Sequence, residues 1–138
     1  MTISISNKEE IQIIREQDVV PLRNRVKDYA VKAGMSILNQ TKVITATSEL
    51  VRNLLKYGGG GKVVIEAVNN GRENGIRITF IDKGPGIADI SLAMKDGYST
   101  GKSLGLGLPG TKRLVNEFAI ESEPGKGTTV AITKWKNG

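Results

Sequence analysis

The segment IRITFIDKGPGI, residues 76–87, decides how the rest of this sequence is interpreted. Residues 76–81 are mainly apolar and predict a β-strand. Asp82 follows this strand directly, and Gly84 and Gly86 come next. A carboxylate at a strand end, followed by a loop whose glycines let the backbone approach another group closely, is typical of a ligand site.

From the sequence, Asp82 has two interpretations. An aspartate before a Gly-Pro-Gly turn often caps that turn by accepting hydrogen bonds from its backbone. A carboxylate on the floor of a pocket would instead accept a hydrogen bond from the exocyclic amine of adenine. Guanine carries a carbonyl at that position, so the contact would select ATP over GTP. Gly84 and Gly86 would then let the backbone pass beneath the base.

Patterns on both sides of this segment predict an α/β sandwich, in which helices cover one face of a sheet. The expected strands are residues 2–15 (as a short hairpin or two pieces), 62–68, 76–81, 119–123 and 128–135. Three helices are expected: the first begins at Asp18 and ends at Gly34, the second spans residues 39–57 and the third spans residues 109–118. Lys134 and Trp135, near the end of the sequence, indicate an edge strand with a frayed end.

Length and composition limit the possible functions. With 138 residues, the chain is expected to form a single domain, 1–138. It has no cysteine, which excludes disulfides and thiolate metal sites, and no histidine, the commonest general base. The net charge of +6 is dispersed and aromatic residues are few, so we expect no nucleic acid partner. No stretch has the pattern of a membrane span or a signal peptide, so we expect no membrane association and a cytoplasmic location.

Glu49 and Asn53 lie about 40° apart on one side of the expected second helix, away from the apolar stripe of Leu50 and Leu54. One interpretation is a solvated polar face. In the other, Glu49 orients or deprotonates a hydroxyl group while the Asn53 carbonyl oxygen holds Mg²⁺, which needs few protein ligands when phosphates and water supply the rest. Lys56, on the same face, would reach a phosphate.

A second glycine-rich segment spans residues 97–110 and holds five glycines. It does not fit the P-loop spacing, because Asp96 stands where the first glycine is required, and no strand leads into the G-x-G-x-x-G match from Gly105 to Gly110. What remains is a loop with hydroxyl groups and a lysine that leads into a helix N-terminus, an arrangement that attracts phosphates. A surface loop without a ligand is the alternative. By itself, Gly125 to Thr128 indicates a hairpin turn.

Taken in order, these pieces resemble the motifs of the Bergerat-fold (GHKL) ATPases, the superfamily of gyrase, MutL and the histidine kinases. The matching segments are Glu49-x-x-x-Asn53 (N box), Asp82-x-Gly84-x-Gly86 (first glycine box), residues 101–108 (second glycine box and ATP lid) and Gly125-x-Gly127-Thr128 (final box). The resemblance covers roughly residues 39–132. It implies the Bergerat ATP-binding fold, with a mixed, mostly antiparallel sheet and helices on one face.

The resemblance also implies roles. Glu49 would be the general base, Asn53 the Mg²⁺ ligand, and Asp82 with Thr128 would hold the adenine. The lid would hold the phosphates. The implied ATP-binding residues are Asn53, Lys56, Asp82, Gly84, Gly86, Thr100, Gly101, Lys102, Ser103, Leu104, Gly105, Leu106, Gly107, Leu108 and Thr128.

Within that superfamily the chain most resembles the anti-sigma-factor serine kinases, and particularly the RsbT-type switch kinases of the stressosome. The segments DGYST (96–100), GLGLPG (105–110) and KRLVNEF (112–118) carry this resemblance. It implies Mg-ATP-dependent phosphorylation of serine or threonine on a STAS-domain substrate or scaffold, with a PP2C-type phosphatase as a second partner, by a monomer or weak dimer. Without a histidine-bearing or transducer domain, histidine autophosphorylation and an ATP-driven clamp are not expected. The alternative is a nucleotide-gated module that binds a sigma factor with little phosphotransfer.

Overall fold

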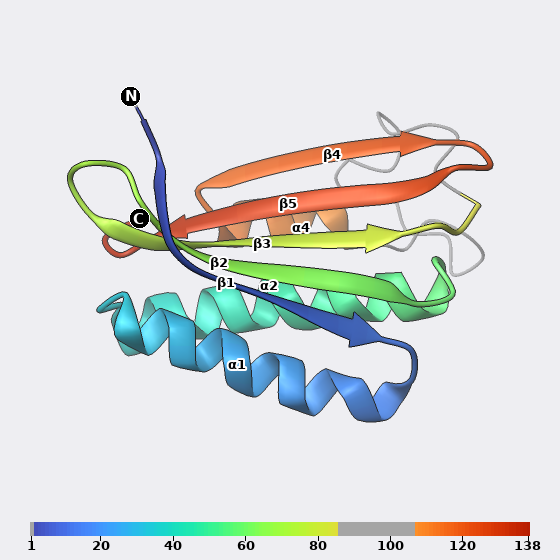
Figure 1. The fold of residues 1–138 in the computed structure, drawn as a ribbon, viewed down its shortest axis with the longest axis horizontal. Coiled ribbons are helices and arrows are strands. Elements are labelled where there is room, and N and C mark those ends of the chain that lie inside the picture. Colours follow the sequence, from blue (N-terminus) through green and yellow to red (C-terminus); the bar gives the residue numbers. More distant parts are fainter. Residues whose placement is uncertain (1, 86–106) are drawn as a thin grey trace.

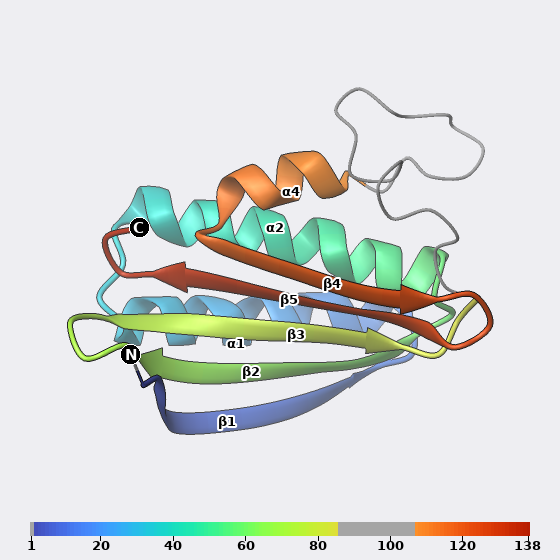
Figure 2. The same cartoon turned by 90° about the horizontal axis from the view of Figure 1, so that it is seen from above.

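The computed structural model describes residues 2–85 and 107–138. In this part of the chain, five strands form one antiparallel sheet with the order β1-β2-β3-β5-β4. The helices α1, α2 and α4 lie on one face of the sheet (Figure 1 and Figure 2). The elements are β1 (Ser4–Ile13), the 3-10 turn η1 (Glu16–Asp18), α1 (Val19–Lys32), α2 (Ile37–Lys56), β2 (Gly61–Asn69), β3 (Asn74–Asp82), α4 (Leu108–Leu114), β4 (Glu117–Glu123) and β5 (Gly127–Trp135). This arrangement confirms the expected α/β sandwich.

Strand β3 lies in the centre of the sheet, between β2 and β5. Its side chains alternate as a strand requires. Ile76, Ile78 and Phe80 are buried beneath the helices. Arg77 and Thr79 lie on the opposite face, which no described helix covers and which we call the helix-free face. β3 pairs with β2 along its whole length and with β5 from Gly75 to Ile81, so its last residue, Asp82, has a fixed position at one end of the sheet, opposite Gly61.

An ion pair crosses the β2–β3 ladder on the helix-free face. Arg77 lies directly opposite Glu66, and its Nε donates to Glu66 Oε1 at 2.9 Å. Glu66 is only 7% exposed, although none of the described helices covers this face. The two neighbouring strands and the Arg77 side chain therefore remove this carboxylate from most of the solvent.

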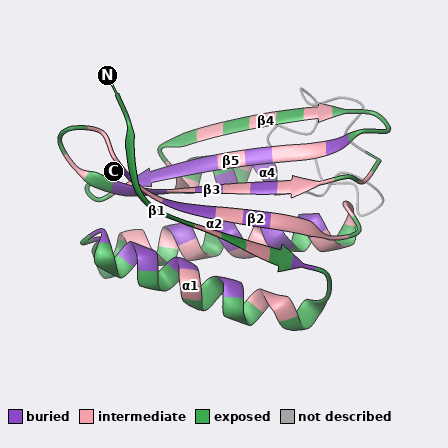
Figure 3. Ribbon diagram, viewed as in Figure 1, coloured by how far each residue is buried: buried purple, intermediate pink, exposed green. Residues whose placement is uncertain are grey.

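The hydrophobic core fills the space between the sheet and the helices. Buried positions follow the inward faces of both layers (Figure 3). The fully enclosed side chains include Ile13, Leu22, Val26, Val43, Val51, Val63, Ile65, Ile76, Ile78, Leu108 and Ile132. Since β2, β3 and β5 all contribute, the core ties the centre of the sheet to α1 and α2.

Helix α2 is the longest helix described and it lies across the sheet. Ser36 caps its N-terminus, because the Ser36 Oγ accepts a hydrogen bond from the Asn39 N–H at 3.1 Å. Val43, Leu50, Val51 and Leu54 form its buried stripe, so the polar residues of α2 face other directions. No helix in the described ranges is both long enough and apolar enough to cross a membrane.

Two of the sequence expectations about element boundaries were wrong. Residues 4–13 form a single strand, not a hairpin, because a register shift between Ile5 and Asn7 lets the whole segment pair with β2. The helix expected over residues 109–118 ends at Leu114. Val115 is extended, since the chain must leave the helix for β4 to pair with β5 from Glu117 onward.

The expectation of an edge strand at Lys134 was also wrong. β5 is an interior strand, because β4 pairs with its outer side. Lys134 is 3% exposed, and its Nζ donates to the Gly138 carbonyl oxygen at 3.0 Å. Burial, and then the charge of Lys42, lower the pKa of Lys134. The end of the chain is not frayed, since Lys136 N donates to the Asn74 carbonyl oxygen at 2.8 Å.

We expect the substitution Ile78→Ala to lower the free energy of unfolding by about 2–5 kcal/mol, because it leaves a cavity at a fully buried position of the central strand. Ile14→Ala is the matched control. Ile14 is 73% exposed, so its substitution should change stability by less than about 0.5 kcal/mol. Urea unfolding of both variants measures the difference, and equal losses would contradict the assigned core.

Candidate functional site

Asp82 is held in one orientation at the end of β3. Its Oδ1 accepts hydrogen bonds from the backbone N–H groups of Gly84, at 2.9 Å, and Thr128, at 3.2 Å. No described residue donates a hydrogen bond to its other oxygen, Oδ2. Asp82 therefore caps the turn, as one interpretation of the sequence proposed, and still keeps one acceptor oxygen for a further partner.

Close backbone packing surrounds Asp82. A β-carbon at Gly58 would lie 2.5 Å from Asp82 Cγ, and one at Gly84 would lie 2.7 Å from the Gly58 Cα atom. A β-carbon at Gly127 would overlap the Asp82 carbonyl oxygen. The Gly125 N–H also donates to the Pro85 carbonyl oxygen at 2.7 Å. The end of α2, the loop after β3 and the β4–β5 turn thus meet at Asp82.

Sequence reasoning did not identify Gly58 as part of the site, because four consecutive glycines after α2 indicated only the end of a helix.

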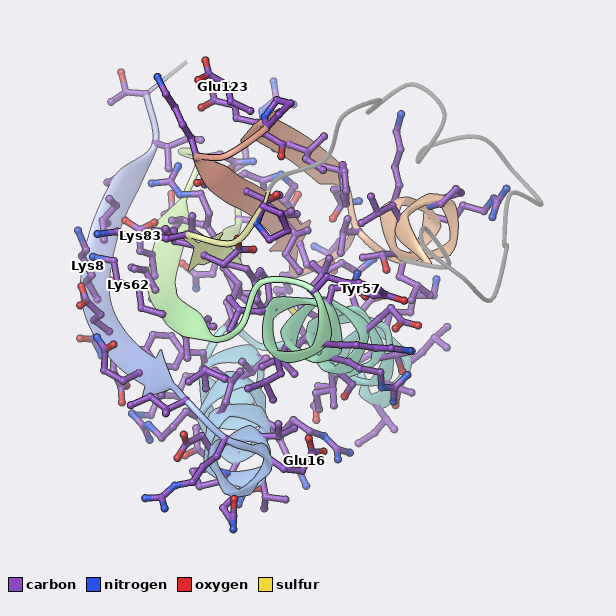
Figure 4. The ribbon with its side chains drawn as sticks, turned by 90° about the vertical axis from the view of Figure 1, so that its right-hand side faces the viewer. Lys8, Glu16, Tyr57, Lys62, Lys83 and Glu123 are labelled. Carbon is purple, nitrogen blue, oxygen red and sulfur yellow. The ribbon has the colours of Figure 1, made fainter. Side chains whose placement is uncertain are left out.

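The side of the sheet on which Asp82 and Lys83 lie follows from the alternation of side chains along a strand. Figure 4 shows the Lys83 side chain on the same side of the sheet as Lys8 and Lys62, away from the helices. Asp82, one residue earlier, points to the other side, toward Gly58 just after α2, where an added β-carbon would meet its carboxylate.

Thr128 is positioned by a second hydroxyl group. Its Oγ1 lies 2.8 Å from Ser122 Oγ, directly across the β4–β5 ladder, and Ser122 Oγ donates to the Gly127 carbonyl oxygen at 3.1 Å. A serine hydroxyl has one proton. When Ser122 gives that proton to Gly127, the Thr128 hydroxyl donates to Ser122 and presents its lone pairs elsewhere. No sequence pattern pointed to Ser122, since only the strand register reveals the pair.

Glu49 and Asn53 both lie on α2 and are half-buried, beside the buried Leu50 and Leu54. Glu49 Oε2 is 3.4 Å from Nη1 of Arg52, which is largely exposed. Gly107 touches the Glu49 carboxylate from the start of α4: its φ is +65°, and a β-carbon there would lie 2.9 Å from Glu49 Oε1. Glu49 and Gly58 are separated by about 13 Å along the helix direction. The candidate site is therefore elongated, with Asp82 near one end and Glu49 toward the other.

Lys56 is exposed at the end of α2, and its Nζ lies 5.3 Å from the centroid of the Tyr57 ring. At this distance the ammonium group makes a cation–π contact. Lys56 therefore has a contact that does not involve a phosphate, and its expected role in binding one stays a prediction.

The structure does not describe most of the expected lid. Gly86, Thr100, Gly101, Lys102, Ser103, Leu104, Gly105 and Leu106 lie outside the described residues. Of the lid positions, Gly107 and Leu108 are described. Leu108 is 2% exposed and belongs to the core, so it has only backbone groups to offer a ligand. Among the described residues, no cluster of three or more acidic side chains is placed to hold a metal ion.

Comparison with known families accounts for this arrangement. Residues 38–137 match the family described as histidine kinase-, DNA gyrase B- and HSP90-like ATPases. The chain belongs to this ATPase family. The match covers α2, the sheet from β2 to β5, and every element that meets at Asp82. It confirms the family membership that the four ordered motifs predicted.

Individual members of this ATPase family are similar over nearly the whole chain. The serine/threonine-protein kinase RsbT of Bacillus subtilis (strain 168) is 42% identical over 125 residues, which cover 91% of this chain and 94% of RsbT. The anti-sigma F factor of Thermoanaerobacter sp. (strain X514) is 34% identical and covers 82% of each chain. The anti-sigma F factor of Caldanaerobacter subterraneus is 30% identical and covers 94% of each.

We expect Gly127→Ala to destabilise the protein more than Gly125→Ala. Both glycines have φ between +80° and +100°, so alanine is strained by roughly 1–2 kcal/mol at either position. Only at Gly127 does the added methyl group also overlap Asp82, whereas nothing lies within 4 Å at Gly125. Urea unfolding of the two variants compares their stabilities. Equal losses would mean that the close approach of Gly127 to Asp82 has no energetic importance.

Proposed function

We propose that this chain is an ATP-dependent protein serine/threonine kinase that phosphorylates a STAS-domain partner and thereby switches between partners. The observation that carries the nucleotide site is the geometry of Asp82. One carboxylate oxygen is fixed by two backbone N–H groups, and the other has no donor among the described residues.

A carboxylate in this position suits adenine. The exocyclic amine of adenine would donate to Asp82 Oδ2, whereas guanine presents a carbonyl oxygen there, which the carboxylate repels. Thr128, whose hydroxyl is oriented by Ser122, lies beside Asp82 and would contact the same base. The glycines at positions 58, 84 and 127 leave no side chains between the segments that surround Asp82. These features fit ATP at the Asp82 end of the elongated site.

Phosphoryl transfer depends mainly on the position of the nucleophile and on stabilisation of charge. In this proposal, Glu49 accepts the proton of a serine or threonine hydroxyl on the partner. The hydroxyl oxygen forms a bond with the γ-phosphorus, and the bond from that phosphorus to the ADP oxygen breaks. Asn53, one helical turn after Glu49, would hold Mg²⁺ through its side-chain carbonyl oxygen, and the ion would neutralise charge on the phosphates.

The partners are inferred from the relatives. One relative bears the name of a serine/threonine-protein kinase, and several bear the name of anti-sigma F factors. These names support a partner-switching role. We propose that the chain performs it in the cytoplasm, with a STAS-domain protein as the phosphate acceptor and a PP2C-type phosphatase as a further partner. The second candidate function is a nucleotide-gated module that binds a sigma factor with little phosphotransfer, and the similarity to the anti-sigma F factors favours it.

We expect Asp82→Asn to weaken ATP binding by at least about tenfold. The asparagine Oδ1 can still accept hydrogen bonds from Gly84 and Thr128, so the turn remains capped. Its NH2 group takes the place of Oδ2 and faces the adenine amine, and two donors cannot form a hydrogen bond with each other. Isothermal titration with ATP and GTP measures the loss and the change in selectivity. An unfolding midpoint close to that of the unsubstituted protein is the required control. Unchanged ATP affinity would exclude Asp82 as the base-binding group.

We expect Glu49→Gln to reduce phosphotransfer by about 10²–10⁴-fold, because an amide cannot accept the hydroxyl proton. ATP affinity should change little. The assay uses labelled Mg-ATP and a STAS-domain protein encoded nearby. Glu16→Gln, the same change at an exposed glutamate outside the site, is the matched control. If the unsubstituted chain binds ATP but transfers no phosphate, the binding-module function replaces the kinase. If Glu49→Gln transfers phosphate normally, Glu49 is not the base.

A further inference from the structure

A groove runs between α1 and α2 on the side of the helices that faces away from the sheet. Its volume is about 460 Å³. One wall includes Val20, Arg23 and Lys27 of α1, and the other includes Ile37, Thr41 and Ile44 of α2. On each helix these positions are three or four residues apart, so they form one continuous stripe. The inward stripes of the same helices, such as Leu22 and Val26 of α1, are already buried in the core.

Apolar side chains in this groove remain open to solvent. Val20 is 59% exposed and Ile37 is 76% exposed, while Ile44 is half-buried between them and the core. Single exposed apolar residues are ordinary on protein surfaces, but several that line one concave groove indicate a contact surface.

The charges in the groove have one sign. Arg23 and Lys27 are both exposed, and neither forms an ion pair with another described residue. This differs from Arg25 on the same helix, which is paired with both Glu9 and Asp28. Among the residues that the structure describes, no acidic side chain lines the groove. Two uncompensated cations beside exposed apolar groups favour a partner that carries carboxylates next to apolar residues.

From these observations we propose that the groove between α1 and α2 binds an acidic amphipathic helix of a partner protein. Two helices side by side offer ridges and grooves into which a third helix packs. Such a helix would place apolar residues at i, i+3, i+4 and i+7 against Val20, Ile37 and Ile44. Its flanking carboxylates would meet Arg23 and Lys27. A membrane surface fits less well, because the apolar side chains line a hollow and do not project from one convex face.

The groove and the candidate nucleotide site share a helix. Ile44 is about 7–8 Å from Glu49 along the axis of α2. The two residues are also about 140° apart around α2, so a partner anchored in the groove would lie on a different side of this helix from Glu49 and would leave Asp82 uncovered. The inference itself does not depend on nucleotide binding, since it rests on residues of α1 and of the first half of α2.

The test uses the full chain, isotopically labelled, and a stapled helical peptide of roughly 18 residues, long enough to form a stable helix. The peptide carries leucines at the amphipathic spacing and glutamates beside them. We expect the peptide to shift the backbone amide NMR signals of residue 20 and of residues 22–27 and 37–44; residue 21 is a proline and has no amide proton. The double variant Arg23→Glu/Lys27→Glu should weaken binding by about tenfold or more. The charge-matched control Lys8→Glu/Arg72→Glu, whose sites are exposed and outside the groove, should bind normally.

A second pair of variants tests the apolar contact. Val20→Ser should weaken peptide binding several-fold, whereas Val31→Ser, at a similarly exposed position of α1 outside the groove, should not. Four results would overturn the proposal. Two concern the peptide: equal binding of a peptide with the same composition in scrambled order, or equal binding of a peptide with lysine in place of glutamate. The other two are binding of phosphatidylglycerol vesicles through the same residues, and concentration-dependent shifts of the groove signals without peptide, which would identify a second copy of the chain as the occupant.

Discussion

The two hydrogen bonds that Asp82 Oδ1 accepts hold together segments that are far apart in the sequence. The Gly84 N–H is two residues away, and the Thr128 N–H is 46 residues away. The carboxylate can accept from both only because glycines at positions 58, 84 and 127 let three segments approach without side chains between them. The proposed nucleotide site, the hairpin β4–β5 and the end of α2 all meet at this contact.

The other end of the candidate site has a different construction. Glu49 and Asn53 are carried by a rigid helix whose opposite face is buried in the core, so their positions depend on packing more than on loop geometry. Gly107 reaches the Glu49 carboxylate from the segment that begins α4. The candidate site thus combines an Asp82 end fixed by backbone contacts with a Glu49 end fixed by helix packing, and α2 connects the two.

Local pattern was sufficient to predict much of this architecture. The alternation in residues 76–81, the apolar stripe of α2 and the Gly-Lys-Gly turn each specify one element, and the ordered motifs gave the fold. Strand order could not be read in the same way. Lys134 was assigned to an edge because the sequence does not show that β4 pairs outside β5. Ser122 was missed for the same reason, since its contact with Thr128 exists only in the β4–β5 register. The role of Gly58 depends on its distance from Asp82, which no local pattern contains.

The Glu66–Arg77 pair on the helix-free face has a consequence for the specificity of folding. A slip of one residue between β2 and β3 would turn every apolar side chain to the wrong face, so hydrophobicity already forbids it. A slip of two residues keeps each side chain on its original face of the sheet, so the alternation of apolar and polar residues does not exclude it. That slip would place Glu66 opposite Gly75 or Thr79 and leave a nearly enclosed carboxylate without its cation. The pair therefore selects one register among those that bury the same side chains, and in doing so it sets where β3 ends and where Asp82 is placed.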